Sequence, residues 1–204
     1  MTENTNKYAY RSSAQSCAHA YLLPAVERIV AGLKPVRIFD LGCGNGAVAD
    51  KFSSYAPVTG VDLSESGVQI ANRHFPHIKI EVGSAYDDLV SKYGRFPVVV
   101  SLEVVEHLYD PRRYAKTLFD LLENGGVAII STPYHGYWKN IALALTGKLD
   151  GHFTALWDGG HIKFWSIRTL RVLLAEAGFT GIEFVRVGRV PPLAKSMIAI
   201  ARRP

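Results

Sequence analysis

The sequence predicts an α/β fold: a doubly wound, mostly parallel sheet with helices on both faces. Short apolar runs typical of buried strands alternate along the chain with amphipathic segments of helical period. The first complete strand pattern ends in a cluster of glycines, which is typical of a tight turn between a strand and a helix. With 204 residues, 48% of them hydrophobic and 20% charged, the chain can bury a core without disulfides. We therefore expect a single domain over residues 1–204.

The expected elements follow a regular order up to residue 131. Strands are expected at residues 36–41, 58–61, 78–82, 97–102 and 127–131. Helices are expected at residues 14–33, 46–55, 65–74, 87–93 and 111–122. The last of these helices has clear end signals, because Asp110 is a capping residue, Pro111 suits the first helical position, and two glycines follow residue 124.

The pattern changes after residue 131. Residues 133–160 contain five aromatic side chains and the apolar run 141–145, and we interpret this stretch as a lid-like insertion. A helix is expected next at residues 166–177, with Ser166 as its cap and Gly178 as its stop. Two closing strands are expected at residues 181–187 and 195–201.

The net charge of +5 comes entirely from the C-terminal part of the chain. Residues 168–204 hold seven basic and two acidic residues, whereas the rest of the chain is balanced. We favour a solvated surface over contact with nucleic acid, because the sequence has no basic stretch interleaved with aromatic residues. Contact with RNA stays open as the alternative.

Cysteine use and the N-terminus predict a cytoplasmic protein. Cys17 and Cys43 are too few for a disulfide framework, which favours a reducing compartment. Residues 1–7 are polar, unlike a signal peptide, and no run approaches the roughly 20 apolar residues of a membrane helix.

A glycine-rich turn flanked by acidic residues is the clearest functional signal. The three glycines stand at positions 42, 44 and 46, Asp40 precedes them, and Asp62 ends the next strand. Glycines let a ligand approach the backbone closely, and the start of the following helix offers free N–H groups. An acidic residue at the end of the second strand can accept both ribose hydroxyls of an adenosine. The turn therefore predicts a cofactor that contains a nucleoside.

Two cofactors fit this spacing. The string Gly42-x-Gly44-x-x-Ala47 satisfies the dinucleotide-binding pattern, so a nicotinamide cofactor and an oxidoreductase are one alternative. Asp40 would repel a pyrophosphate but would suit the ammonium of an amino-acid end. S-adenosylmethionine (SAM) therefore fits the whole string better. A tight turn without a ligand is the remaining interpretation.

Four strings resemble the successive motifs of class I SAM-dependent methyltransferases. They are Phe39-Asp-Leu-Gly-Cys-Gly-Asn-Gly46, Gly60-Val-Asp-Leu-Ser64, Glu103-Val-Val-Glu-His-Leu108 and Asn124-Gly-Gly-Val127. The resemblance covers roughly residues 36–131 and implies a Rossmann-like sheet of seven strands with the last strand antiparallel. It also implies cofactor contacts at Asp40, Gly42, Gly44, Asn45, Asp62, Leu63, Ser84, Ala85 and Leu102. The methionine part would face the first three of these, the ribose Asp62, and the adenine Ser84 and Ala85, while Leu102 would close the site.

Glu103, Glu106 and His107 follow the fourth expected strand. In a helical turn, offsets of three and four residues would place all three side chains on one face. Two carboxylates and an imidazole suit a divalent metal ion that prefers oxygen ligands. A histidine at this point of the fold can also act without a metal, as a general base or as a structural contact. Both interpretations stay open.

A later histidine extends this set. His161 lies in the string Gly159-Gly-His-Ile-Lys-Phe-Trp-Ser166. A similar pairing of Glu-x-x-Glu-His with a later histidine occurs in ubiquinone-biosynthesis O-methyltransferases and in small-RNA 3′-terminal 2′-O-methyltransferases. The resemblance implies a divalent cation, Mg²⁺ or Zn²⁺, held by Glu103, Glu106, His107 and His161. Alternatively, His161 only anchors the insertion to the sheet. His135 and His152 are interpreted as surface or lid residues.

These patterns predict an enzyme that transfers the methyl group of SAM to a small-molecule hydroxyl of the phenol or catechol type. A metal ion would lower the pKa of that hydroxyl; without one, His107 or His161 would act as the general base. The alternatives are an RNA 2′-O-methyltransferase and a SAM-binding module without catalysis.

Residues 134–149 combine apolar side chains with Lys139 and Lys148 at helical spacing. This predicts an amphipathic segment, which would be a substrate lid, a helix packed over the sheet, or a contact with a membrane surface. Membrane contact would suit a prenylated substrate, as the resemblance to the ubiquinone enzymes implies. The substrate itself does not carry over, because this sequence departs from that subfamily in its N-terminal and C-terminal regions. The sequence gives no oligomeric state.

Overall fold

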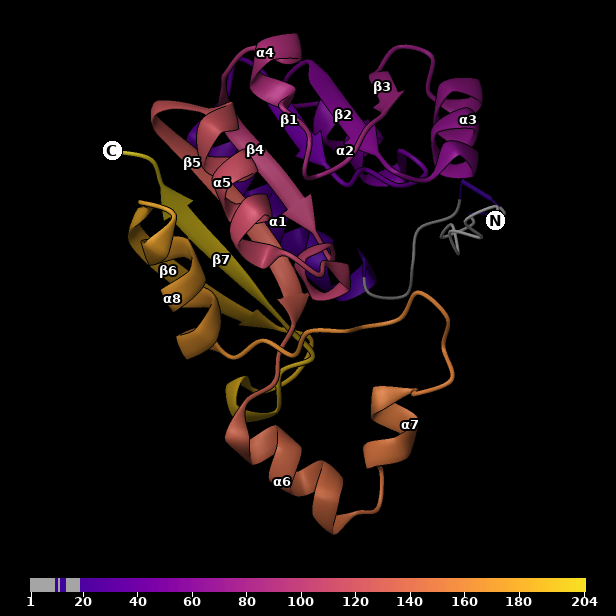
Figure 1. Cartoon of the computed structure of the whole chain (residues 1–204), viewed down its shortest axis with the longest axis vertical. Helices are drawn as coiled ribbons and strands as arrows, with labels where there is room; N and C mark the ends of the chain where they lie inside the picture. The colour runs from indigo at the N-terminus through magenta and orange to yellow at the C-terminus, as the bar shows by residue number, and fades with distance from the viewer. Residues whose placement is uncertain (1–9, 11, 14–18) are drawn as a thin grey trace.

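A seven-stranded sheet forms the centre of the computed structural model, which describes residues 10, 12–13 and 19–204 (Figure 1). Its order is β3-β2-β1-β4-β5-β7-β6. The strands are β1 (Ile38–Leu41), β2 (Val58–Asp62), β3 (Lys79–Val82), β4 (Phe96–Leu102), β5 (Leu122–Pro133), β6 (Thr180–Val187) and β7 (Ser196–Arg202). β7 pairs antiparallel with β5 and β6, and the remaining pairs are parallel. The expected Rossmann-like sheet with an antiparallel last strand is confirmed.

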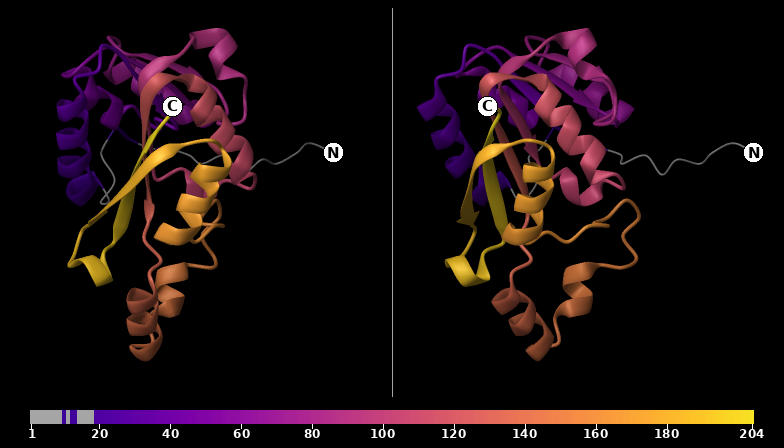
Figure 2. Two further views of the ribbon diagram at one scale, coloured as in Figure 1. Left: turned by 90° about the vertical axis from the view of Figure 1, so that its left-hand side faces the viewer. Right: turned by 60° about the vertical axis from the view of Figure 1, so that its left-hand side comes forward.

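Helices cover both faces of this sheet (Figure 2). One face carries α1 (His19–Leu33), α2 (Ala47–Ser53) and α3 (Glu65–His74), and the other carries α4 (Leu89–Tyr93), α5 (Pro111–Leu121) and α8 (Ile167–Glu176). Successive strand residues point to opposite faces, so Ile38 joins the core under α1 whereas Phe39 joins the core under α5. The start of the expected helix 14–33, with Cys17, lies outside the described residues.

The junction between α5 and β5 differs from the expectation of a simple helix end. The Asp110 side chain accepts the N–H of Arg113 and caps α5 as predicted. β5, however, already begins at Leu122, which pairs with Phe96, and the next pair joins Val127 to Val98. Residues 123–126 therefore bulge opposite a proline at position 97, which has no N–H to donate to the ladder.

After β5 the chain leaves the sheet, and the stretch expected from the sequence to be a lid-like insertion, residues 133–160, is named the lid below by that expectation. α6 (Tyr137–Leu145) and α7 (Leu149–Phe153) project beyond the carboxyl end of β5 (Figure 1). The chain then returns beside the short 3₁₀ helix η1 (Val105–His107), where the Glu106 carbonyl accepts the N–H groups of Ile162 and Lys163 at 2.9 and 3.0 Å. None of the described helices is both long and apolar enough to cross a membrane.

Several basic side chains of the C-terminal region stabilise the fold. Arg203 Nη1 donates to the carbonyls of Phe119 and Leu122 at 2.9 and 2.8 Å, and its guanidinium lies over the Phe119 ring. Arg171 donates to the Ile182 carbonyl at 2.7 Å. The basic excess expected from the sequence is therefore not only a solvated surface.

Replacing Arg203 by Met should lower the free energy of unfolding by about 2 kcal/mol, because the carbonyls at the end of α5 would lose a charged donor. Urea unfolding followed by circular dichroism measures this loss. Arg202→Met is the matched control, since the Arg202 side chain is exposed. Equal unfolding midpoints for the two variants would contradict the role assigned to Arg203.

Candidate functional site

The glycine turn after β1 has the backbone that its sequence predicts. Gly42, Gly44 and Gly46 have φ values of 86°, 55° and 79°. A Cβ on Gly42 would lie 2.5 Å from the Val104 side chain, so a larger residue does not fit there. The turn leads directly into α2 and leaves its backbone close to the carboxyl ends of β1 and β2.

Two buried carboxyl groups flank this turn. Asp40 Oδ2 has no hydrogen-bond partner, and burial, with a smaller effect of Asp62, raises the pKa of Asp40 to about 7. Asp62 accepts the N–H of Gly44 at 2.7 Å and that of Ser64 at 2.8 Å, but burial still raises its pKa. An unpartnered buried carboxyl beside a glycine turn suits a ligand that brings a positive charge.

The other predicted cofactor residues lie along the same edge of the sheet. Leu63 follows β2 with its side chain exposed, Ser84 and Ala85 follow β3, and Leu102 ends β4 with its side chain buried. Asn45 lies in the turn, and its Nδ2 donates to the Ser12 carbonyl at 2.8 Å. The fold thus gathers these positions at neighbouring strand ends, where open α/β sheets bind ligands. Their individual roles stay predictions.

Tyr10 also belongs to this region, although the sequence analysis assigned it nothing. A Cβ on Gly44 would lie 2.4 Å from the Tyr10 hydroxyl oxygen, so Tyr10 packs directly on the turn. Its backbone N–H donates to Ser66 Oγ at 3.1 Å. A single tyrosine in a polar segment carries no sequence signal for such a contact.

A second polar cluster joins η1 to the segment after the lid. Glu106 is 1% exposed, and its Oε1 lies 4.0 Å from His107 Nε2 and 3.9 Å from His161 Nε2. Within the described part of the chain, neither oxygen of Glu106 makes a hydrogen bond of normal distance and angle, and the Thr132 hydroxyl is the side-chain donor that lies near them. His107 Nδ1 lies 3.0 Å from the Gly159 carbonyl, so this nitrogen carries the proton and Nε2 keeps its lone pair. Three ligand-type atoms therefore converge on one point, all within 4.8 Å of one another.

Glu103 is not part of this cluster. It has a φ of 56°, and the helical turn begins only at Val105, so the expected helix that would align Glu103 with Glu106 is wrong. Glu103 Oε1 instead accepts the Ser131 hydroxyl at 2.8 Å. Burial raises the pKa of Glu103 to about 7, and burial followed by repulsion from Glu103 raises that of Glu106 well above its ordinary value.

Lys139 lies in the root of the lid with its ammonium buried. It is 7% exposed, and its Nζ donates to the Tyr134 carbonyl at 2.8 Å. Burial and then Arg189 lower the pKa of Lys139 to about 8. The expected amphipathic pattern is reversed here, since Lys139 faces inward while Trp138 and Leu145 are 69% and 83% exposed. The carbonyls of Tyr134 and Lys195, 2.8 and 3.4 Å from Lys139 Nζ, hold the ammonium inside.

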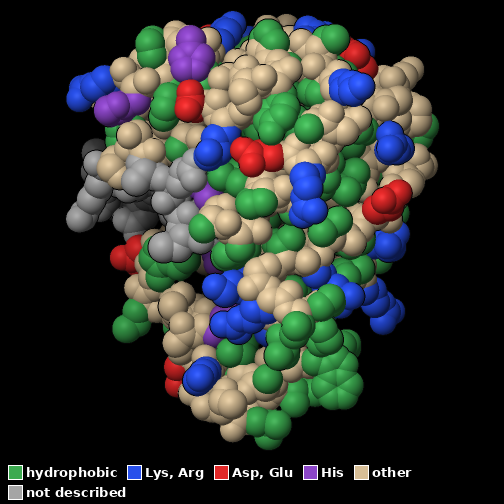
Figure 3. Space-filling model, turned by 180° about the vertical axis from the view of Figure 1, so that it is seen from behind, with side chains coloured by type: hydrophobic (Ala, Val, Ile, Leu, Met, Phe, Trp, Pro, Cys, Tyr) green, Lys and Arg blue, Asp and Glu red, His purple; other side chains and the backbone are tan. Residues whose placement is uncertain are grey.

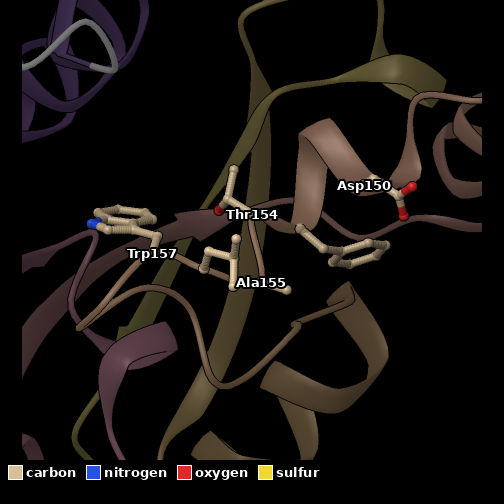
Figure 4. Close-up of a pocket in the computed structure, with 6 residues that line it drawn as sticks. Asp150, Thr154, Ala155 and Trp157 are labelled. Carbon is tan, nitrogen blue, oxygen red and sulfur yellow. The ribbon is translucent and has the colours of Figure 1, made fainter.

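An open, mostly apolar depression of about 470 Å³ lies on the surface beside Trp157, near the second cluster (Figure 4). It is lined by Asp150, Phe153, Thr154, Ala155, Leu156 and Trp157. The Trp157 ring centroid lies 6.0 Å from that of His107 and 5.3 Å from that of His161. The depression therefore offers room for a small molecule near the converging side chains.

Comparison with known proteins agrees with this architecture. Residues 13–183 match the family described as methyltransferase domain. The chain belongs to this family. A ubiquinone biosynthesis O-methyltransferase of Dinoroseobacter shibae is 32% identical over 158 residues, which are 74% of this chain and 62% of that protein. The protein of the same name from Ruegeria pomeroyi is 34% identical over 163 residues, 77% of this chain and 64% of that protein.

The chain therefore spans less than two thirds of the length of these relatives. Among solved structures, a SAM-dependent methyltransferase of Mesorhizobium loti has a TM-score of 0.68 at 20% identity and covers 88% of this chain and 96% of its own. The methyltransferase domain of bacterial CtHen1-CN has a TM-score of 0.65 at 20% identity, with the same coverage. These two likenesses concern the fold. Together with the family match, they confirm the resemblance to class I SAM-dependent methyltransferases.

The affinity of this methyltransferase for S-adenosylhomocysteine should rise between about pH 6 and pH 8, because Asp40 loses its proton near pH 7 and only its ionised form attracts the ligand ammonium. Asp40→Asn should weaken binding about tenfold at pH 8 and remove most of this rise. Isothermal titration calorimetry at several pH values measures both effects.

The raised pKa of Asp40 also makes the free energy of unfolding depend on pH. A carboxyl whose pKa is raised in the folded state contributes stability at low pH that is lost as the pH rises, here between about 4 and 7. Asp40→Asn should flatten this fall in the cofactor-free protein. An unchanged pH profile in both binding and unfolding would contradict the role of Asp40.

Proposed function

We propose that this chain transfers the methyl group of SAM to a hydroxyl oxygen of a small molecule of the phenol or catechol type. The convergence of Glu106, His107 and His161 near an apolar depression carries the proposal. The names of the relatives, which are O-methyltransferases of ubiquinone biosynthesis, support oxygen as the acceptor atom. The proposal concerns the methyltransferase domain that this chain contains, and not the whole length of the longer relatives.

The reaction needs alignment and the removal of one proton. The acceptor oxygen forms a bond to the methyl carbon while the bond from that carbon to the sulfonium sulfur breaks, and the hydroxyl proton passes to a base. His107 suits this role, since the Gly159 carbonyl accepts its Nδ1 proton and Nε2 therefore carries the lone pair that takes up another proton. Burial lowers the pKa of His107, which keeps the ring neutral before the reaction.

The same side chains fit a divalent cation. Both oxygens of Glu106 are buried without a hydrogen bond of normal geometry from the described residues, and two imidazole nitrogens lie close to one of them. Glu106, His107 and His161 would hold the ion, while Ser131 holds Glu103 away from it. Two imidazoles and one carboxylate are a typical donor set for Zn²⁺ more than for Mg²⁺. A bound ion would lower the pKa of the acceptor hydroxyl.

The outer face of the lid supports contact with a membrane surface. Tyr137, Trp138 and Leu145 are exposed on α6, and Leu156 is exposed beyond α7. In the view from behind, hydrophobic side chains gather on the projecting part of the molecule, with Lys and Arg side chains beside them (Figure 3). Such a surface suits the interface of a bilayer with anionic lipids. A peripheral location at the membrane is therefore part of this proposal.

We expect His107→Ala to lower kcat about 100-fold for methyl transfer from labelled SAM to catechol, because the cluster loses its proton acceptor or, where an ion is bound, one of its ligands. Exhaustive chelation should also reduce the activity of the unmodified protein, and Zn²⁺ should restore it. Glu106→Gln should bind S-adenosylhomocysteine normally but should not respond to Zn²⁺. His74→Ala, with its side chain exposed on α3, is the control. Full activity after both chelation and His107→Ala would overturn the proposed chemistry.

The double change Trp138→Ser with Leu145→Ser should reduce co-sedimentation with phosphatidylglycerol vesicles at least fivefold, because it removes exposed apolar area from α6. Val36→Ser, which removes an exposed apolar side chain before β1, is the matched control. Vesicles of phosphatidylcholine alone should bind less of the unmodified protein. If the double variant binds as well as the control, the membrane contact is wrong.

A further inference from the structure

Three buried polar atoms under the lid make no hydrogen bond of normal distance and angle with the residues that the structure describes. They are His135 Nδ1, Asn140 Oδ1 and His152 Nε2. His135 follows β5, Asn140 lies on α6 and His152 lies on α7. Folded proteins satisfy nearly all buried polar atoms, because an unsatisfied one costs the free energy of its lost hydration. Three such atoms on three neighbouring segments therefore indicate a missing partner.

The rings around these atoms fix their positions. His135 is 9% exposed, and its backbone N–H donates to the Trp165 carbonyl at 2.9 Å. Its ring is stacked with Phe153, with 5.8 Å between centroids and 19° between planes, and meets the edge of Phe164 at 5.0 Å. The His152 ring lies 5.3 Å from it. These contacts hold the plane of the His135 ring between Phe153, Phe164 and His152.

The charges around these atoms favour a hydroxyl group over a metal ion. Burial lowers the pKa of His135 to about 4, with further lowering by Lys139, His152 and His161, so its ring is neutral. A hydrogen-bonding contact with the Asn140 side chain raises the pKa of His135 slightly, so the two side chains are neighbours, but the contact does not reach normal hydrogen-bond geometry. The Lys139 ammonium would repel a cation here. A hydroxyl can donate to one unpartnered atom and accept from another, as these neutral groups require.

We propose that His135, Asn140 and His152 form a second polar subsite that binds a further hydroxyl group of the acceptor, so that the preferred acceptor is a polyhydroxylated ring. The inference rests on the proposed function, which puts the methylated hydroxyl at Glu106, His107 and His161. One short segment links the two places, since His161 belongs to the first and Phe164 packs against the second. Two classes of compound carry several hydroxyl groups on one ring, polyphenols and sugars, and the test below distinguishes them.

A ligand bound at this subsite would also stabilise the closed position of the lid. Its three atoms come from the end of β5, from α6 and from α7, so a hydroxyl bound among them would connect both lid helices to the sheet. All three atoms are closed to solvent in this conformation, so the ligand must enter while the lid is displaced. A site built to bind a hydroxyl discriminates strongly against an analogue that lacks it, because the buried groups then stay unpaired.

The kinetic test compares matched acceptors. Pyrogallol and phenol form the polyphenol pair, and methyl α-glucopyranoside and cyclohexanol form the sugar pair. Asn140→Leu and His152→Phe should each raise KM for the polyhydroxylated member of the accepted pair at least tenfold, with kcat changed less than threefold. KM for the monohydroxylated member should stay within twofold. Equal effects on both members, or no effect on either, would overturn the subsite.

Two controls test whether the changes in KM come from the subsite itself. His74→Phe makes the same chemical change as His152→Phe at an exposed position on α3 and should leave all KM values unchanged. Thermal unfolding checks that each variant folds, and Asn140→Ser replaces Asn140→Leu if the leucine variant does not.

A binding experiment separates this inference from the proposed function. In the complex with S-adenosylhomocysteine and ¹⁵N-labelled histidine, pyrogallol or the glucoside should shift the imidazole resonances of His135 and His152, whereas phenol and cyclohexanol should not. Such shifts without methyl transfer would contradict the proposed function alone. Methyl transfer without these shifts would contradict the subsite alone. Saturable shifts of the same two resonances with Zn²⁺ would show a metal site and overturn the assignment to a hydroxyl.

Discussion

The pairing of β4 with β5 determines where the parts of the candidate site lie. Glu103 N–H, directly after β4, donates to both the carbonyl and the hydroxyl of Ser131 in β5, and the Ser131 hydroxyl donates back to Glu103. This contact ends the strand pair and turns the chain into η1 through a positive φ. The Glu106 carbonyl then accepts the N–H groups of Ile162 and Lys163, which belong to the segment that follows the lid. The same central pair thus anchors the cluster of Glu106 and both ends of the lid.

Buried acidic groups dominate the electrostatics of the carboxyl edge of the sheet. Asp40, Asp62, Glu103 and Glu106 all have raised pKa values, and burial is the largest cause in each case. They differ in their hydrogen bonds. Asp62 accepts backbone N–H groups and Glu103 accepts the Ser131 hydroxyl. Asp40 and Glu106 each keep at least one oxygen that no described residue hydrogen-bonds with normal geometry. Positive charge brought by a ligand would relieve the cost at these last two positions. Asp62 and Glu103 therefore contribute hydrogen bonds to the fold, whereas Asp40 and Glu106 have oxygens that a ligand could contact.

The parts of the molecule that local signals determine could be predicted from the sequence, and the parts that depend on distant contacts could not. The alternation of strands and helices up to residue 131, the glycine turn and the cap of α5 follow from spacing and residue type, whereas the antiparallel last strand was expected only from the family resemblance. The helical turn through Glu103 was wrong because the contact with Ser131 imposes a positive φ that no local pattern indicates. Lys139 looked like one of the basic flanks of an amphipathic helix, but carbonyls from Tyr134 and Lys195 draw it inward. His135 was expected at the surface or in the lid, and its burial depends on rings more than ten residues away.

The lid is polar on its inner side and apolar on its outer side, the reverse of an ordinary helix that packs on a core. Lys139, Asn140 and His152 face inward while Trp138 and Leu145 face solvent, so hydrophobic burial contributes little to holding α6 and α7 in place. The attachments include the Lys139 ammonium on two backbone carbonyls and the Phe153 ring against His135 and Phe164. Segments with few buried apolar contacts open at low free-energy cost. The position of α6 and α7 therefore depends on polar contacts at their inner face more than on buried apolar area.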